Sequence, residues 1–192
     1  GAESHEYRPG FPEVIQTDKV SFSLDTVASG LSIPWGMTWL PGGDMLVTER
    51  SGELFRFRDG SLQSMIGGVP EVYPNGQGGL LDIKLHPDYE QNGWIYLAYS
   101  KPEDNGGNTA IMRARLEDNN LVDKEQLFKA EPDTRSGVHF GCRMAFDGNG
   151  YLFFSVGERG NPPNAQDLTN HCGKIHRIHD DGRIPDDNPF VD

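Results

Sequence analysis

Positive charge is scarce in this chain of 192 residues, which carries 29 acidic and 17 basic side chains and a formal net charge of −12. DNA, RNA and anionic membrane surfaces present phosphate groups that need a basic patch, so the composition disfavours all three as partners. Long apolar runs are also lacking. None approaches the ~18 residues that a membrane span needs, and no membrane insertion is expected.

Helical periodicity is equally sparse, and the opening residues 1–7 are too polar for a signal peptide. A processed secreted protein and a shortened chain would both begin in this way. Glycine and proline, in contrast, are abundant at 24 and 13 residues, and they separate short apolar runs. This pattern predicts an all-β fold of many strands and turns, with one sizeable core or part of a larger one.

An N-terminal arm, residues 1–18, shows few apolar side chains and no period. Apolar and polar residues then alternate over residues 20–27, which predicts a half-buried strand. Three similar blocks follow, each expected to hold strands joined by turns. The predicted strands are residues 33–40, 45–48 and 53–58 in the first block, 78–85, 94–100 and 109–116 in the second, and 143–146, 151–156 and 173–178 in the third. A polar stretch at residues 101–108 is expected to be a loop.

The turns that organise the three blocks begin at Pro41, Pro87 and Asp147, 46 and 60 residues apart. A repeat of roughly 40–50 residues with several strands in each is typical of β-propeller blades. A β-sandwich also has regular strands but no reason to repeat this block. Residues 19–192 are therefore expected to form about three blades (approximately 30–60, 76–118 and 137–180), half of a propeller. The open sheet edges of a half-propeller leave self-association of the chain as one outcome.

The third block begins with a hairpin whose turn, residues 147–150, reads Asp-Gly-Asn-Gly, a sequence that accepts the positive φ angles of tight turns. If Phe146 pairs with Tyr151, His139 lies opposite Glu158, with Cβ atoms roughly 4.5–5.5 Å apart. Such a carboxylate could fix the imidazole tautomer and leave the other nitrogen as a base. The alternative is a surface His–Glu pair, and a slip of one residue would put the two on opposite faces.

The two cysteines, Cys142 and Cys172, could form a bridge closing a loop of about thirty residues, which would stabilise the fold by up to ~4 kcal/mol. The same register puts Ser155 opposite Cys142, so a central strand separates the two thiols. Two strand spacings come to about 9.5 Å, more than the ~7 Å between Cα atoms that a disulfide allows. The spacing favours free thiols without deciding the question.

Several short motifs, in order and at their spacings, make the chain recognisable from about residue 31 to residue 191. It resembles the soluble, pyrroloquinoline quinone (PQQ)-dependent sugar dehydrogenases of the glucose/sorbosone dehydrogenase family, especially the bacterial aldose sugar dehydrogenases. The motifs that carry the resemblance are Pro34-Trp35-Gly36, the run from Gly76 to Asp82, His139-Phe140-Gly141 with Arg143, Gly157-Glu158, Ala165-Gln166-Asp167, Gly173-Lys174 and the run from Ile184 to Phe190.

The resemblance implies a six-bladed propeller with PQQ over one mouth of the ring. His139 matches the general base that removes the proton from the anomeric hydroxyl of an aldose, while hydride passes to the quinone and a lactone forms. Glu158 matches the carboxylate that orients this base. Gln77 matches a cofactor contact, as does His139, and glycines beside Gln77 would let the backbone approach a flat ring. Without the resemblance, Gln77 would be read as an ordinary polar loop residue.

The resemblance also implies calcium, an external electron acceptor and a periplasmic or secreted location. The family's cationic cofactor contacts and its calcium loop are expected beyond residue 192. A tricarboxylate quinone needs such charges, so the 192-residue chain is expected to be inactive alone. The alternative function is a non-catalytic β-propeller binding module that kept the fold and lost the chemistry.

Three other features are expected to be structural. His171, His176 and His179 suggest a metal cluster, but residues 176 and 179 have opposite parity on a strand, so no metal site is assigned in this chain. The acidic pairs at residues 180–181 and 186–187 lack calcium-loop spacing and read as turns. Trp35 and Trp39 share a strand face with Met37 and are expected in the core, with Trp35 at the mouth as the alternative.

Overall fold

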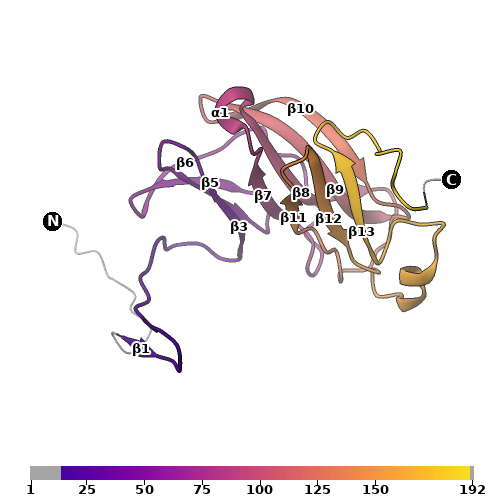
Figure 1. Cartoon of the computed structure of the whole chain (residues 1–192), viewed down its shortest axis with the longest axis horizontal. Helices are drawn as coiled ribbons and strands as arrows, with labels where there is room; N and C mark the ends of the chain where they lie inside the picture. Colours follow the sequence, from indigo (N-terminus) through magenta and orange to yellow (C-terminus); the bar gives the residue numbers. More distant parts are fainter. Residues whose placement is uncertain (1–13, 191–192) are drawn as a thin grey trace.

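The computed structural model describes residues 14–190, and their regular structure is almost entirely strand, which confirms the all-β prediction (Figure 1). A two-stranded ribbon is followed along the chain by three larger antiparallel sheets. Among the described residues, helix is limited to α1 (Tyr89–Asn92) and one 3-10 segment, η1 (Pro162–Gln166). α1 lies in the predicted turn between the first two strands of the second sheet.

The three larger sheets correspond to the three repeated blocks, and in each sheet the neighbouring strands are also neighbours in sequence. Their strands are β3 (Pro34–Trp39), β4 (Met45–Glu49), β5 (Leu54–Arg58) and β6 (Ser61–Met65) in the first sheet, β7 (Leu80–Leu85), β8 (Trp94–Glu103), β9 (Gly106–Glu117) and β10 (Asn120–Lys129) in the second, and β11 (Met144–Phe146), β12 (Tyr151–Val156) and β13 (Lys174–His179) in the third.

Two of these strands, β6 and β10, were not predicted, and the loop expected at residues 101–108 was wrong. β6 and β10 are edge strands, largely exposed and polar, so they lack the apolar alternation that marks a strand in sequence. Residues 101–103 and 106–108 extend the β8–β9 hairpin, with Glu103 opposite Gly106. Gly107 pairs with Thr134, so the segment that leads into the third block covers the extension.

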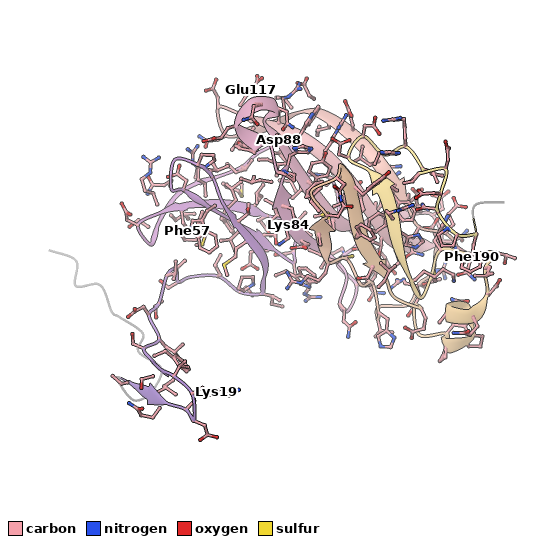
Figure 2. The ribbon with its side chains drawn as sticks, in the orientation of Figure 1. Lys19, Phe57, Lys84, Asp88, Glu117 and Phe190 are labelled. Atoms are coloured by element: carbon pink, nitrogen blue, oxygen red, sulfur yellow. The ribbon has the colours of Figure 1, made fainter. Side chains whose placement is uncertain are left out.

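The strand expected at residues 20–27 is also a wrong prediction. Only Ser21–Phe22 (β2) is extended, paired with Ile15–Gln16 (β1) in a ribbon that projects from the sheets, where Lys19 marks its tip (Figure 2). The apolar side chains of Val20 and Phe22 are exposed because, among the described residues, no larger sheet packs on this ribbon. Of the predicted arm, residues 1–13 lie outside the described residues.

The first strands of the sheets lie together and join consecutive sheets. Gly36 of β3 approaches β7 so closely that a Cβ atom there would lie 2.9 Å from the Leu81 carbonyl oxygen. Asp82 of β7 is buried and accepts hydrogen bonds from the Met144 amide (2.9 Å) and from Arg143 (3.2 Å) of the third sheet. Apolar side chains fill the space between the sheets, so the three sheets are consecutive blades of a β-propeller.

The two outer flanks of this set of blades are apolar and exposed. Met37 and Trp39, predicted in the core, are 57% and 51% exposed, which corrects that prediction. They point away from the second sheet because Gly36, on the opposite face of β3, lies against it. At the other end, Ile175 and Phe190 are exposed on the third sheet's outward side, where Figure 2 labels Phe190.

Candidate active site

The hairpin of the third sheet differs from its predicted register by one residue. Phe146 pairs with Leu152, not with Tyr151, because the Asp147 side chain accepts hydrogen bonds from both the Asn149 and Tyr151 amides and shapes a longer turn. β11 begins at Met144, so His139 is not on a strand and the parity argument does not apply to it.

His139 nevertheless contacts Glu158, as predicted, by a different route. Its Nδ1 atom hydrogen-bonds the Glu158 carboxylate. The backbone curls back toward the end of β12 through left-handed φ angles at His139 (56°), Gly141 (76°) and Cys142 (86°). Gly157 permits the approach, since a Cβ atom there would lie only 2.0 Å from the His139 carbonyl oxygen. A glycine and a left-handed loop, and not strand pairing, bring the two side chains together.

The Glu158 carboxylate is suited to orienting the ring. The hydrogen bond with His139 holds the pKa of the Glu158 carboxyl below its ordinary value, against the opposing effect of desolvation. The same oxygen accepts the Gly160 amide at 3.2 Å. A carboxylate at Nδ1 places the proton on Nδ1 and leaves Nε2 as the basic nitrogen. The His139 side chain is 51% exposed, and within residues 14–190 no group hydrogen-bonds Nε2.

Gln77, predicted as a cofactor contact, lies beside His139. Its side-chain Oε1 accepts the His139 amide at 2.8 Å, and its own amide donates to the Gly137 carbonyl at 2.7 Å. Gly76 has a φ of 59°, and a Cβ atom on it would lie 2.2 Å from that same carbonyl oxygen. The glycine-rich turn of the second blade therefore docks on the loop of the third. The three predicted site residues meet at one end of the sheets, here called the mouth.

A fourth residue, Arg159, was not predicted. It follows Glu158 directly, is 2% exposed, and donates to the carbonyl oxygens of Ser136 (2.6 Å) and Val138, on the N-terminal side of His139. Desolvation lowers the pKa of its guanidinium. Nothing in the sequence separates this arginine from a surface arginine, because its burial depends on a loop from another part of the chain.

Arg143, one of the resemblance residues, presents a cation that is 66% exposed. Its guanidinium lies 4.1 Å from the centroid of the Trp35 ring and pairs with buried Asp82. Trp35 is half-buried: it packs against the core, as predicted, and the arginine covers its ring. These three residues come from three different blades, so the cation is fixed where the blades converge.

The features expected to be structural have ordinary partners. His176 donates a hydrogen bond from Nε2 to the His171 carbonyl at 2.8 Å, and its ring stacks on Phe154. His179 packs on Tyr151. Within residues 14–190 no group of three or more His, Cys, Asp or Glu side chains is placed to hold a metal ion. Cys142 and Cys172 are buried free thiols, as the strand spacing favoured.

Comparison with known proteins supports the same reading of the fold. A family model described as Glucose / Sorbosone dehydrogenase matches residues 31–192. Aldose sugar dehydrogenase YliI of Escherichia coli is 42% identical over 174 residues, which are 88% of this chain and 47% of that protein. The chain spans about half the length of the curated relatives it matches.

Two solved structures are similar to most of the chain. The soluble aldose sugar dehydrogenase from Escherichia coli in its apo-form superposes with a TM-score of 0.83 at 43% identity, covering 87% of this chain and 50% of that one. The PQQ-bound form of aldose sugar dehydrogenase from Streptomyces coelicolor superposes with a TM-score of 0.77 at 34% identity, covering 88% and 51%. In the part of this chain that the structure describes, no helix is long and apolar enough to cross a membrane.

Proposed function

Because this chain belongs to the glucose/sorbosone dehydrogenase family, we propose that the protein carrying it oxidises the anomeric carbon of aldose sugars to lactones, with PQQ as cofactor. One observation carries the proposal. An exposed imidazole, oriented at Nδ1 by a carboxylate, leaves Nε2 free at the mouth, and Gln77 lies directly beside it. A histidine that a carboxylate orients in this way can act as a general base.

The residues of this chain would act on the proton of the anomeric hydroxyl. Glu158 holds the Nδ1 proton in place, so Nε2 of His139 accepts the hydroxyl proton as the sugar is oxidised. The imidazolium that results is stabilised by the Glu158 carboxylate. PQQ, when bound, supplies the acceptor for the hydride that leaves the anomeric carbon. The sugar thus loses one proton to His139 and one hydride to the cofactor.

Two polar side chains would serve one side of a tricarboxylate quinone: Gln77 at the mouth and Arg143 where the three blades converge. Oε1 of Gln77 is occupied by the His139 amide, which leaves the carboxamide N–H groups as donors. The exposed guanidinium of Arg143 can pair with a carboxylate. Calcium belongs to the same proposal through the resemblance, and no ligand for it is assigned in this chain. An external electron acceptor and a periplasmic or secreted location are proposed on the same basis.

Spectral titration of the full-length protein with PQQ and calcium tests the function, followed by aldose-dependent reduction of a dye. We expect a quinone spectrum that saturates with cofactor and dye reduction that requires an aldose. The absence of both would favour the other candidate, a β-propeller that binds without catalysis.

Replacing Glu158 with Gln is expected to lower kcat by less than the ~10²–10⁴ contributed by a general base. The pKa of Glu158 is lowered, so its carboxylate is charged throughout the range in which an imidazole titrates. Without that charge, the attraction that favours a bound proton on the pair is lost. The acidic limb of the kcat/KM profile should therefore move to lower pH, measured over roughly pH 5 to 8.

Glu125→Gln is the matched control, since Glu125 pairs with Arg113 on the outer strands of the second blade. It should leave the pH profile unchanged. An unshifted acidic limb in the Glu158→Gln enzyme would show that this carboxylate does not act on the base.

A further inference from the structure

Four carbonyl groups of the loop that carries His139, residues 136–140, accept hydrogen bonds from other parts of the chain. The Gly137 carbonyl accepts the Gln77 amide, and the Phe140 carbonyl accepts the Thr109 hydroxyl at 2.6 Å. The two remaining carbonyls before His139, those of residues 136 and 138, both accept from Arg159. A single side chain therefore fixes the loop at two points on the N-terminal side of the base.

The surroundings of Arg159 are unusual for an arginine. Its guanidinium carbon lies 3.4 Å from the centroid of the Phe140 ring, and Nη2 also reaches the Gly107 carbonyl at 3.3 Å. In the described part of the chain no carboxylate forms an ion pair with it, since the neighbouring Glu158 carboxylate is bound to His139, and its buried Nε has no hydrogen-bond partner. Burying a cation without an opposite charge is unfavourable, so a role limited to filling space would be met better by an apolar side chain.

We propose that Arg159 is a positioning residue for His139. By holding the carbonyls of Ser136 and Val138 it sets the backbone of the loop, so that the His139 amide meets Gln77 and the ring meets Glu158. Glu158 and Arg159 are consecutive, so one short segment orients both the ring of the base and the chain that carries it. The catalytic part of this inference rests on the proposed function.

Arg159→Met and Arg159→Lys in the full-length protein test the assignment, with Arg113→Met as the matched control. Arg113 is also largely buried, lies 4.2 Å from the Trp94 ring centroid and donates to the Asp180 carbonyl, but at the end of the sheets opposite the mouth. Arg159→Met should lower kcat by about 10–10²-fold, because small misplacements of a reacting group cost this much, with KM changed less than about threefold. Arg159→Lys should lose less, since an ammonium can still donate to a carbonyl.

Amide hydrogen exchange over residues 136–140 supplies a readout that needs no activity. We expect faster exchange there in Arg159→Met and wild-type exchange in Arg113→Met. Unchanged kcat and exchange in Arg159→Met, or an equal loss of kcat in Arg113→Met, would overturn the assignment. If Arg159→Met does not fold, Arg159→Lys decides by the same measurements. A wild-type protein that oxidises no aldose would remove the proposed function, while the exchange data would still decide whether Arg159 holds the loop.

Discussion

Replacing His139 with Ala is expected to lower kcat for aldose oxidation by ~10²–10⁴, the usual contribution of a positioned general base. The affinity for PQQ should change much less. Gln77 contacts the main-chain amide of residue 139 and not its ring, so the substitution leaves the position of Gln77 in place. Steady-state turnover with a dye acceptor gives kcat, and spectral titration gives the dissociation constant of the cofactor.

His86→Gln offers a matched control because His86 also pairs with a carboxylate, that of Asp180, at 3.1 Å. This pair lies among Tyr96 and Phe146 at the end of the blades opposite the mouth. The His86→Gln substitution should change the free energy of unfolding and leave kcat near the wild-type value. Wild-type turnover in the His139→Ala enzyme would remove His139 as the base.

Gly157→Ala is expected to have the second largest effect, although it adds only one methyl group. The new Cβ atom would lie 2.0 Å from the His139 carbonyl oxygen and 2.9 Å from its Cβ, so the loop must move. A shift of about 1 Å in a catalytic group lowers turnover by on the order of 10²-fold. Overpacking should also reduce the free energy of unfolding by about 1–3 kcal/mol.

The control for this change is Gly42→Ala, in the turn between β3 and β4. A Cβ atom at residue 42 meets nothing within 4 Å, and the residue is not among the glycines with positive φ. Denaturant unfolding and kcat should both stay near wild type. If the two variants behave alike, the loop can move without loss of stability or turnover. The close approach at Gly157 would then not set the position of His139.

The sequence allowed the blades to be predicted wherever burial imposes an apolar pattern. β4, β7, β8 and β12 are buried on at least one face, and their residues show it. The pattern fails at the sheet edges, where β6 and β10 face water and accept polar residues. The same pattern wrongly predicted Met37 and Trp39 in the core. These apolar side chains lie on a flank of the first sheet that no described residue covers.

The site was predicted in part, and partly for the wrong reason. The predicted hairpin register paired His139 with Glu158, but that register is wrong by one residue. The contact exists because left-handed residues and Gly157 fold the loop back, which no alternation rule encodes. Arg159 and the Gln77–His139 contact depend on two blades docking, across 62 positions in the second case. Only three-dimensional packing, or a family resemblance, reveals such pairs.

Backbone strain around His139 limits how the stability of this protein can be raised. His139, Cys142 and Arg159 adopt φ angles of 56°, 86° and 62°, a region that favours glycine. Each non-glycine residue held there opposes folding by roughly 1–3 kcal/mol. Laboratory evolution that rewards heat resistance alone would therefore favour the loss of these residues, and with them the imidazole. A screen for variants of higher thermal stability should therefore also select for turnover in every round. The residues whose strain lowers stability include the proposed general base.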